Sequence, residues 1–534
     1  MKKTFLIITL ITACAQPMLG QAVIDALPNI SGQLKGTACQ TAMGGAFGAL
    51  GGELSSIAQN PAGIGVYRSS EISVTPSFNF FDNSVKSPTG SSRNNDFYFT
   101  ADNMGVVGVI NFNKGALRNL NFGFAYNNIS NFNNKYRADW GNIGSSITQF
   151  IASQANSLGC YPHDLALASN YNPYDSNLPW LSVLGYNTNL IHPLNNNGVY
   201  NSIFSPSATS GNAALIGYTS GGIDEYDFNI SGNIWDKFYW GVTVNVNNIL
   251  YRVESYYSET LQNAQVANNH GENRKVYNTN GTFELQNLLR TTGYGAGAKL
   301  GIIYRPTNAL RLGIAFHTPT FYEMTDTYSA AVDYRFDNVA GKPLMGRKDN
   351  IDNQTDLGSF SYNFSTPWHL IGSVAMVLGK SAIISVDYEY IDVPMMSFSS
   401  IYHDYTVSNN SIKEASQGTH NVRLGAEYRI SPAFSVRAGY AYESSPIKAE
   451  YYSGNLTPMI VEGTLIHYQI PGDTHNITCG VGYSINNISI DAAYVFRMQP
   501  YSIYAYPTAH SGSYSPTIMD THLNSLKITL AYRF

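Results

Sequence analysis

The chain has 534 residues, of which only 13% are charged, and it contains 39 Tyr and 25 Phe. This composition is unlike that of several joined soluble enzyme domains. The net charge of -5 is small, which argues against a nucleic-acid partner. The four cysteines include no CxxC spacing and give no support for a metal site or a disulfide framework.

Residues 1–20 have the pattern of a secretory signal peptide. Two lysines precede an apolar run from Phe5 to Ile11, and small residues follow that run. The stretch that ends at Cys14 also fits a lipoprotein cleavage box, with Cys14 as the lipidated residue. We therefore expect an exported protein, and the sequence leaves both the cleavage site and the lipidation of Cys14 open.

The segment 21–70 is rich in small residues and shows no strand pattern. Its glycines allow close approach of the backbone and unusual dihedral angles, and its few large apolar residues offer surface for packing. Pro61 fixes a turn and biases Asn60 toward an extended conformation. We expect this segment to plug the lumen of the barrel described next, either as a movable hatch or as a fixed filler. The residues expected to gate the lumen are Met43, Gly44, Gly45, Phe47, Asn60, Pro61, Ala62 and Gly63.

Residues 71–534 contain a long series of two-faced strands. At the C-terminus, Leu526, Leu530 and Phe534 fall on one face and Lys527 and Arg533 on the other. The same alternation recurs in about fourteen segments, and short and long connections alternate between them, as in an outer-membrane barrel. The expected strands lie near 71–81, 97–112, 120–136, 223–233, 238–257, 291–304, 310–335, 357–377, 382–399, 419–430, 434–445, 473–485, 488–504 and 522–534. The sequence therefore predicts an all-β transmembrane antiparallel barrel, and the alternative is a secreted all-β solenoid or sandwich.

The largest connection is predicted as a long external loop near 137–222. Within it, apolar residues between Ile143 and Leu158 recur at helical spacing. This stripe is compatible with an apolar groove in which a substrate first binds, and equally with packing onto the rim of the barrel.

Cationic side chains on the expected lumen face are candidates for binding an anionic head group. An alternative for Arg423, Arg437 and Arg497 is that they pair with Glu427, Glu443 and Asp491 in a ladder that only supports the barrel. The candidates are Lys299, Arg311, His317, Arg423, Arg437 and Arg497.

Several motifs resemble those of the FadL/TodX family of outer-membrane long-chain fatty acid transporters. The most specific is the NPAG run, Asn60 to Gly63, followed at once by a strand; Gly36 to Ala38 and Ala42 to Phe47 also match, and Tyr304 to Pro306 matches more weakly. The resemblance implies fourteen strands and an N-terminal hatch. It also implies that a ligand lands on external loops, reaches a pocket beside the hatch and leaves sideways near the third strand. The candidates for this exit are Gly123, Asn127 and Asn128.

These observations predict a monomeric channel in the outer membrane of a Gram-negative bacterium that passively takes up hydrophobic small molecules. The favoured ligands are long-chain fatty acids, with aromatic hydrocarbons and haem left open. No catalytic residue, metal or cofactor is expected, and no nucleic acid. The expected partners are the ligand, outer-membrane lipid and the barrel assembly machinery, since the terminal Phe534 resembles an assembly signal.

Two other classes of function stay open. One is an adhesin or a structural outer-membrane barrel that uses its long loops for contact. The other is a barrel lipase or protease, for which His163-Asp164 and His403-Asp404 supply ingredients without a GxSxG motif.

Overall fold

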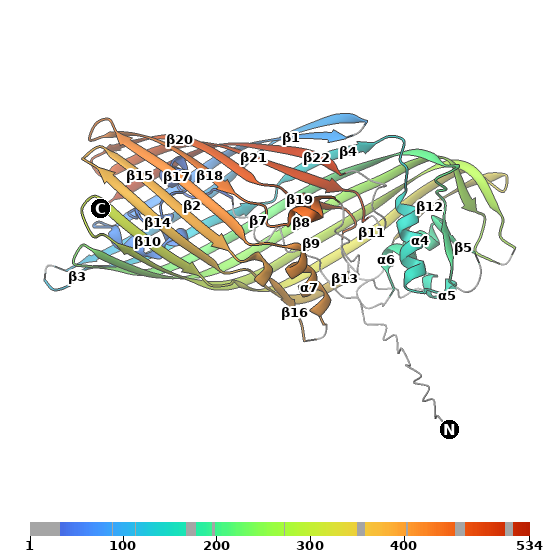
Figure 1. Ribbon diagram of the computed structural model, residues 1–534, viewed down its shortest axis with the longest axis horizontal. Helices are drawn as coiled ribbons and strands as arrows, with labels where there is room; N and C mark the ends of the chain where they lie inside the picture. Colours follow the sequence, from blue (N-terminus) through green and yellow to red (C-terminus); the bar gives the residue numbers. More distant parts are fainter. Residues whose placement is uncertain are drawn as a thin grey trace, which may run out of the picture.

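The computed structural model describes residues 33–87, 89–112, 114–166, 178–194, 198–271, 273–349, 358–401, 404–453, 465–507 and 516–534. The predicted signal peptide, with Cys14, lies outside these residues. The described chain forms a closed antiparallel barrel whose strands run obliquely along its long axis (Figure 1). None of its helices is long and apolar enough to cross a membrane.

The barrel has fourteen strands, which confirms the predicted fold. It closes where β22 pairs with β1, from Glu71 opposite Arg533 to Lys86 opposite Ile518. Some barrel strands are interrupted and carry more than one label: β3 with β4, β10 with β11, β12 with β13 and β14, β15 with β16, and β19 with β20. The labelled strands of the barrel are β1 (Glu71–Ser87), β2 (Gly90–Asn111), β3 (Leu117–Asn131), β4 (Asn134–Trp140), β7 (Ser210–Ile234), β8 (Phe238–Ala267), β9 (Val276–Tyr304), β10 (Leu310–His317), β11 (Phe321–Val339), β12 (Lys342–Asp349), β13 (Gly358–Ser365), β14 (His369–Leu378), β15 (Ala382–Ile391), β16 (Ser397–Ser399), β17 (Thr419–Arg429), β18 (Phe434–Glu443), β19 (Tyr468–Pro471), β20 (Thr474–Ile485), β21 (Ile488–Tyr504) and β22 (Thr517–Arg533).

The faces of the strands are inverted relative to a water-soluble protein. On β22, Leu526 and Leu530 are 43% and 47% exposed on the outside, whereas Ser525 and Lys527 are 3% and 2% exposed on the inside. An apolar exterior around a polar interior is the arrangement of a barrel that faces lipid. Closure leaves no sheet edge in the lipid, where each unpaired backbone group costs several kcal/mol.

The two ends of the barrel differ. Short turns lie at the end that also holds the C-terminus and the start of β1, where Ser70 and Phe534 exchange two backbone hydrogen bonds of 3.1 and 2.9 Å. The helices α4 and α6 lie toward the opposite end (Figure 1). The remaining elements are α2 (Ala38–Ala42), α3 (Ser56–Gln59), the 3-10 helix η2 (Pro61–Val66), α4 (Ile147–Ser157), α5 (Pro162–Leu165), α6 (Trp180–Asn187), β5 (Ile191–Pro193), β6 (Tyr200–Ser202), the 3-10 helix η3 (Val393–Met395), α7 (Thr406–Ala415) and the 3-10 helix η4 (Ala449–Ser453).

The strands at the helical end are longer than predicted. The sequence pattern placed polar loops at 82–96 and 258–290, but β1, β2, β8 and β9 continue through most of these residues. The long connection near 137–222 narrows to residues 141–209 for the same reason, since β4 and β7 extend into it. Beyond the lipid, polar side chains on both faces of a strand carry no penalty, so the apolar alternation that marks a membrane strand is lost there.

The helical stripe in this connection forms α4. Ser146 caps the helix in a capping box with Gln149, and the backbone N–H of Ile147 donates to Glu259 of β8 at 2.8 Å. Ile147 and Ile151, which belong to the predicted stripe, are buried. The stripe therefore packs against the protein and does not offer an open groove to a substrate.

Candidate functional site

The N-terminal segment, residues 33–70, lies inside the barrel. Its helix α2 contacts β18, β20, β21 and β22, whereas η2 contacts β3, β7, β8 and β9. These two sets of strands lie on different sides of the barrel, because they are far apart in the pairing order. The segment therefore reaches across the lumen and fills it next to the end with the short turns.

Glycines of the barrel wall make room for this segment. A Cβ atom on Gly439 would lie 2.2 Å from the backbone nitrogen of Gly44, and one on Gly241 would lie 2.3 Å from the carbonyl carbon of Pro61. These glycines occur as cross-strand pairs, Gly425 opposite Gly439 and Gly241 opposite Gly301. Only a wall without side chains at these points lets the backbone of the segment approach so closely.

Polar and charged wall residues hold the same segment. Asp387 of β15 accepts from the backbone N–H of Gly48 at 2.8 Å and from Gln59 at 2.9 Å. Arg311 of β10, one of the predicted ligand-binding residues, donates instead to the carbonyl of Leu50 at 2.6 Å. Loosening the segment would break several such bonds together, each worth about 1 kcal/mol net and more where a charge is involved.

The predicted gating residues lie at the centre of this packing. Asn60 accepts from the backbone N–H of Ala62 at 3.2 Å and donates to the carbonyl of Gly48 at 2.6 Å, so it ties two turns of the segment together. Gly44 and Gly45 have φ angles of +64° and +78°, which favour glycine. The other predicted gating residues, Met43, Phe47, Pro61, Ala62 and Gly63, are buried.

A cavity of about 280 Å³ lies between this segment and the wall. Ligand pockets typically have volumes of about 300–1,000 Å³, so this cavity is at the lower limit of that range. Three of the predicted cations, Lys299, His317 and Arg423, line it, and so does Lys35 of the segment. The structure thus brings together three of the six candidates and adds one that the sequence pattern did not single out.

The cations around the cavity differ in how far they are neutralised. Lys299 lies 2.5 Å from Glu225 and 3.5 Å from Asp227, so one lysine faces two carboxylates. At another part of the lining two lysines face one carboxylate, because Lys35 and Lys527 both contact Asp102. Burial lowers the pKa of Lys35 to about 8.

Arg437 and Arg497 bond to other side chains of the barrel wall. Arg437 of β18 bridges Glu427 on the adjacent β17 and Asp491 on β21, which lies beyond β20, and this is the core of the predicted ladder. Arg497 donates to Gln499 at 2.8 Å. Neither arginine is part of the lining of the cavity. Arg423 departs from the expected ladder, because its partner is Glu389 on β15.

The third barrel strand is irregular beside the cavity. The ladder between β2 and β3 ends at Asn103 opposite Asn127, and β4 continues this barrel strand in pairing with β7. The register between β3 and β7 shifts between Asn128 and Ser130. Asn127 and Asn128 therefore lie where the ladder ends, and both line the cavity. Gly123 lies further along the ladder and faces Ile57 of the N-terminal segment.

The sequence pattern does not indicate several residues of this site. Lys35, Asp102, His369 and Glu389 line the cavity although no local pattern distinguishes them from other polar residues. The sequence does contain one feature that indicates how the N-terminal segment packs. Inward-facing glycines on neighbouring strands, such as the glycine pairs of the wall, indicate close approach of another backbone.

A closed barrel with an apolar exterior, a polar interior and an N-terminal segment inside the lumen defines an outer-membrane protein of the plugged-barrel class. A family model described as outer membrane protein transport protein (OMPP1/FadL/TodX) matches residues 223–534. This match spans more than half of the chain, and the chain belongs to that family. Its place is accordingly the outer membrane of a Gram-negative bacterium.

Three solved structures illustrate what this chain is similar to. A FadL homologue of Pseudomonas aeruginosa is 13% identical, with coverage of 94% of this chain and 98% of its own and a TM-score of 0.49. The toluene transporter TodX of P. putida is 12% identical, with coverage of 94% and 99% and a TM-score of 0.45. The toluene transporter TbuX of Ralstonia pickettii is 15% identical, with coverage of 94% and 98% and a TM-score of 0.44. A search of curated proteins found no match.

Proposed function

We propose that this protein is a passive uptake channel for long-chain fatty acids, and that residues 33–70 form the hatch that gates it. The single observation that carries the proposal is the cavity beside the hatch, with Lys35 in its lining. Lys35 belongs to the hatch itself, so a ligand bound at this lysine touches the element that must move for passage.

The mixed lining of the cavity favours an amphipathic ligand. Leu34, Ile129, Ile371 and Ile391 provide apolar surface, and charged side chains provide the rest. A pure hydrocarbon would cover those charged groups without offering them a hydrogen bond, which is costly in a buried site. A fatty acid satisfies both parts of the lining, because apolar burial of about 25 cal/mol per Å² supplies affinity and the carboxylate takes a cation. The relatives TodX and TbuX are named as toluene transporters, so an aromatic hydrocarbon is the second candidate ligand.

Lys35 is the best candidate partner for the carboxylate. The side chain of this lysine is 7% exposed, and it shares Asp102 with Lys527, so two lysines contact one carboxylate while Asp224 acts from further away. Lys299 and Arg423 are less suitable, because carboxylates of the wall already neutralise both of them.

The irregular third strand supports a sideways exit. A ligand in the cavity contacts Asn127 and Asn128, where the ladder between β2 and β3 ends. We propose that release occurs at this point and that Gly123 instead serves to seat the hatch.

A catalytic role is not part of this proposal. His163 is 79% exposed at its side chain beside Asp164, which is the environment of a solvated pair rather than of an activated base. His403, the other histidine considered for catalysis, lies outside the described residues. An adhesive or purely structural role would not need a lined cavity against the hatch.

Direct binding separates these possibilities. We expect purified protein in detergent to bind labelled oleate saturably and a Lys35→Met variant to bind it about tenfold more weakly, a change of about 1.4 kcal/mol. Unlabelled toluene should compete poorly. Equal binding of oleate by both proteins, or strong competition by toluene, would overturn the assignment of the ligand.

A further inference from the structure

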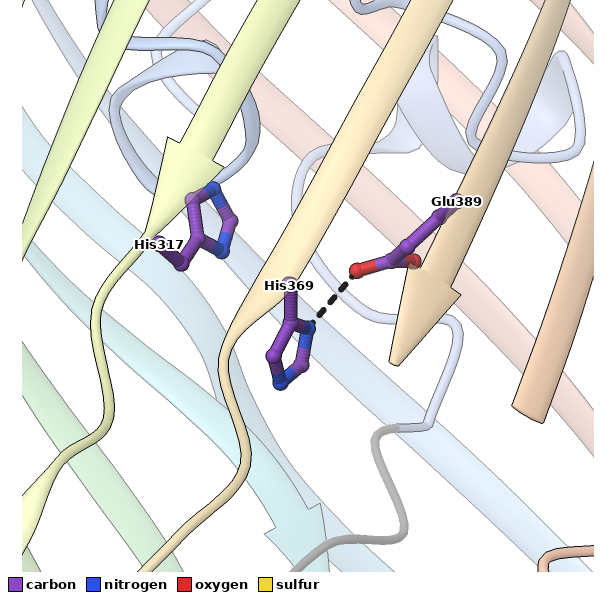
Figure 2. A group of neighbouring side chains, drawn as sticks. All are labelled: His317, His369 and Glu389. Atoms are coloured by element: carbon purple, nitrogen blue, oxygen red, sulfur yellow. Dashed lines mark hydrogen bonds and ion pairs between the residues drawn. The ribbon is translucent and has the colours of Figure 1, made fainter. Parts of the chain in front are cut away.

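Two histidines and a glutamate form a compact cluster in the wall of the cavity. His317 ends β10, His369 begins β14, and Glu389 lies on β15, three strands that are neighbours in the barrel. Figure 2 shows the three side chains close together on these neighbouring strands. His317 and His369 are direct cross-strand partners with stacked rings, whose centroids lie 5.6 Å apart.

The cluster brings potential metal-binding atoms within reach of one ion. One nitrogen of each histidine and one carboxylate oxygen lie within 4.8 Å of one another. His369 Nδ1 and Glu389 Oε1 are 2.8 Å apart and share a hydrogen bond (Figure 2). In a tetrahedral zinc site, bonds of about 2.0–2.1 Å place neighbouring ligand atoms roughly 3.4 Å apart, so small side-chain rotations bring these atoms to that spacing.

Surrounding groups orient two of the three side chains. His317 Nε2 lies 2.9 Å from the carbonyl oxygen of Gln59. A carbonyl only accepts, so Nε2 carries the proton and a neutral His317 keeps the lone pair of Nδ1 free. Glu389 Oε2 accepts from Asn421 at 3.1 Å and pairs with Arg423, which directs Oε1 toward His369. Such outer partners are characteristic of metal-binding histidines and carboxylates.

We propose that His317, His369 and Glu389 bind one divalent transition-metal ion of the zinc class inside the lumen. Two imidazoles and one carboxylate suit zinc, whereas magnesium and calcium prefer oxygen ligands throughout. The ion takes the place of the hydrogen between His369 Nδ1 and Glu389 Oε1, and a neutral His369 then carries its proton on Nε2. The fourth ligand comes from the cavity, which the three side chains line.

Charges of both signs surround the cluster. Glu389, Glu225, Asp227 and Glu443 supply four carboxylates in this region, and Arg423, Lys299 and Arg497 supply three positive charges. Arg423 neutralises Glu389 only through Oε2, and Lys299 is engaged by its own two carboxylates. Glu389 Oε1, which faces His369, is therefore the carboxylate oxygen that stays available to a metal ion.

Titration of zinc into tag-free, chelator-treated protein in detergent tests this site. By calorimetry we expect the wild type to bind one Zn²⁺ per chain, and Co²⁺ to give the absorption of a nitrogen- and oxygen-bound ion. His317→Ala and His369→Ala should weaken binding at least about tenfold. Excess Mg²⁺ or Ca²⁺ should not compete.

Matched variants make the result interpretable. His420→Asn removes an exposed histidine of β17 that bonds to Tyr388, and it should bind zinc like the wild type. Heat-modifiable mobility on gels checks that each barrel is folded, and His369→Gln replaces the alanine variant if that one does not assemble. Absence of stoichiometric zinc binding in the wild type, or equal binding by the His317 and His369 variants, would overturn the proposal. Because these readouts are independent of fatty acids, they do not depend on the proposed transport function.

Discussion

Glycines of the barrel wall determine how closely the backbone of the hatch packs against it. Gly439 permits contact with Gly44 that no side chain would allow. Gly439→Val should therefore dislodge the hatch at a cost of about 1–3 kcal/mol and change oleate uptake. Gly372→Val is the matched control, because a Cβ at Gly372 meets nothing within 4 Å. Uptake by liposomes carrying each variant is the measurement, and equal uptake by both would contradict the role of Gly439.

The charge of Lys35 predicts a pH dependence of binding. Burial lowers the pKa of Lys35 to about 8, so the amine is protonated below this pH and neutral above it. The oleate carboxylate stays ionised, and its attraction to Lys35 is lost as the pH rises through 8. Affinity for oleate should fall accordingly in the wild type and stay flat in Lys35→Met when binding is measured on both sides of pH 8. A parallel fall in both proteins would exclude Lys35 as the partner.

At the scale of elements, membrane strands were predictable and their extensions were not. The alternation in β22 is enforced by lipid on one side and a wet lumen on the other. No such constraint acts where β2 runs through Asn94 and Asn95 beyond the lipid, so those residues resembled a loop. The residues that line the cavity were predicted only in part, because Lys35 and His369 acquire their neighbours only when distant segments meet in the closed barrel.

The hatch is the element whose mobility matters most. Asn60→Ala removes the cap on η2 and the bond to the carbonyl of Gly48, a loss of about 1–3 kcal/mol within the hatch. Deletion of Gly44 and Gly45 shortens the same element. Both changes should alter uptake while heat-modifiable mobility on gels stays normal, because the barrel closes through its own ladders. Collapse of that mobility would identify the segment as a structural filler.

At the scale of the whole molecule, closure depends on the last strand. β22 pairs with both β21 and β1, and the terminal Phe534 is bound to Ser70 through the backbone. Truncation of Phe534 should lower the amount of folded protein in outer membranes, because the expected signal for the assembly machinery is lost with it. Immunoblots of heated and unheated membranes measure this, and normal levels would contradict a role for the terminal aromatic residue.

In the proposed channel, ligand passage depends on the hatch. The most direct test of this dependence is uptake of labelled oleate by liposomes that carry the wild type or the variant without Gly44 and Gly45, at equal amounts of folded protein. We expect saturable uptake by the wild type and a clearly different rate for the variant. Identical rates for the two proteins, or no uptake above that of empty liposomes, would contradict a hatch-gated fatty acid channel.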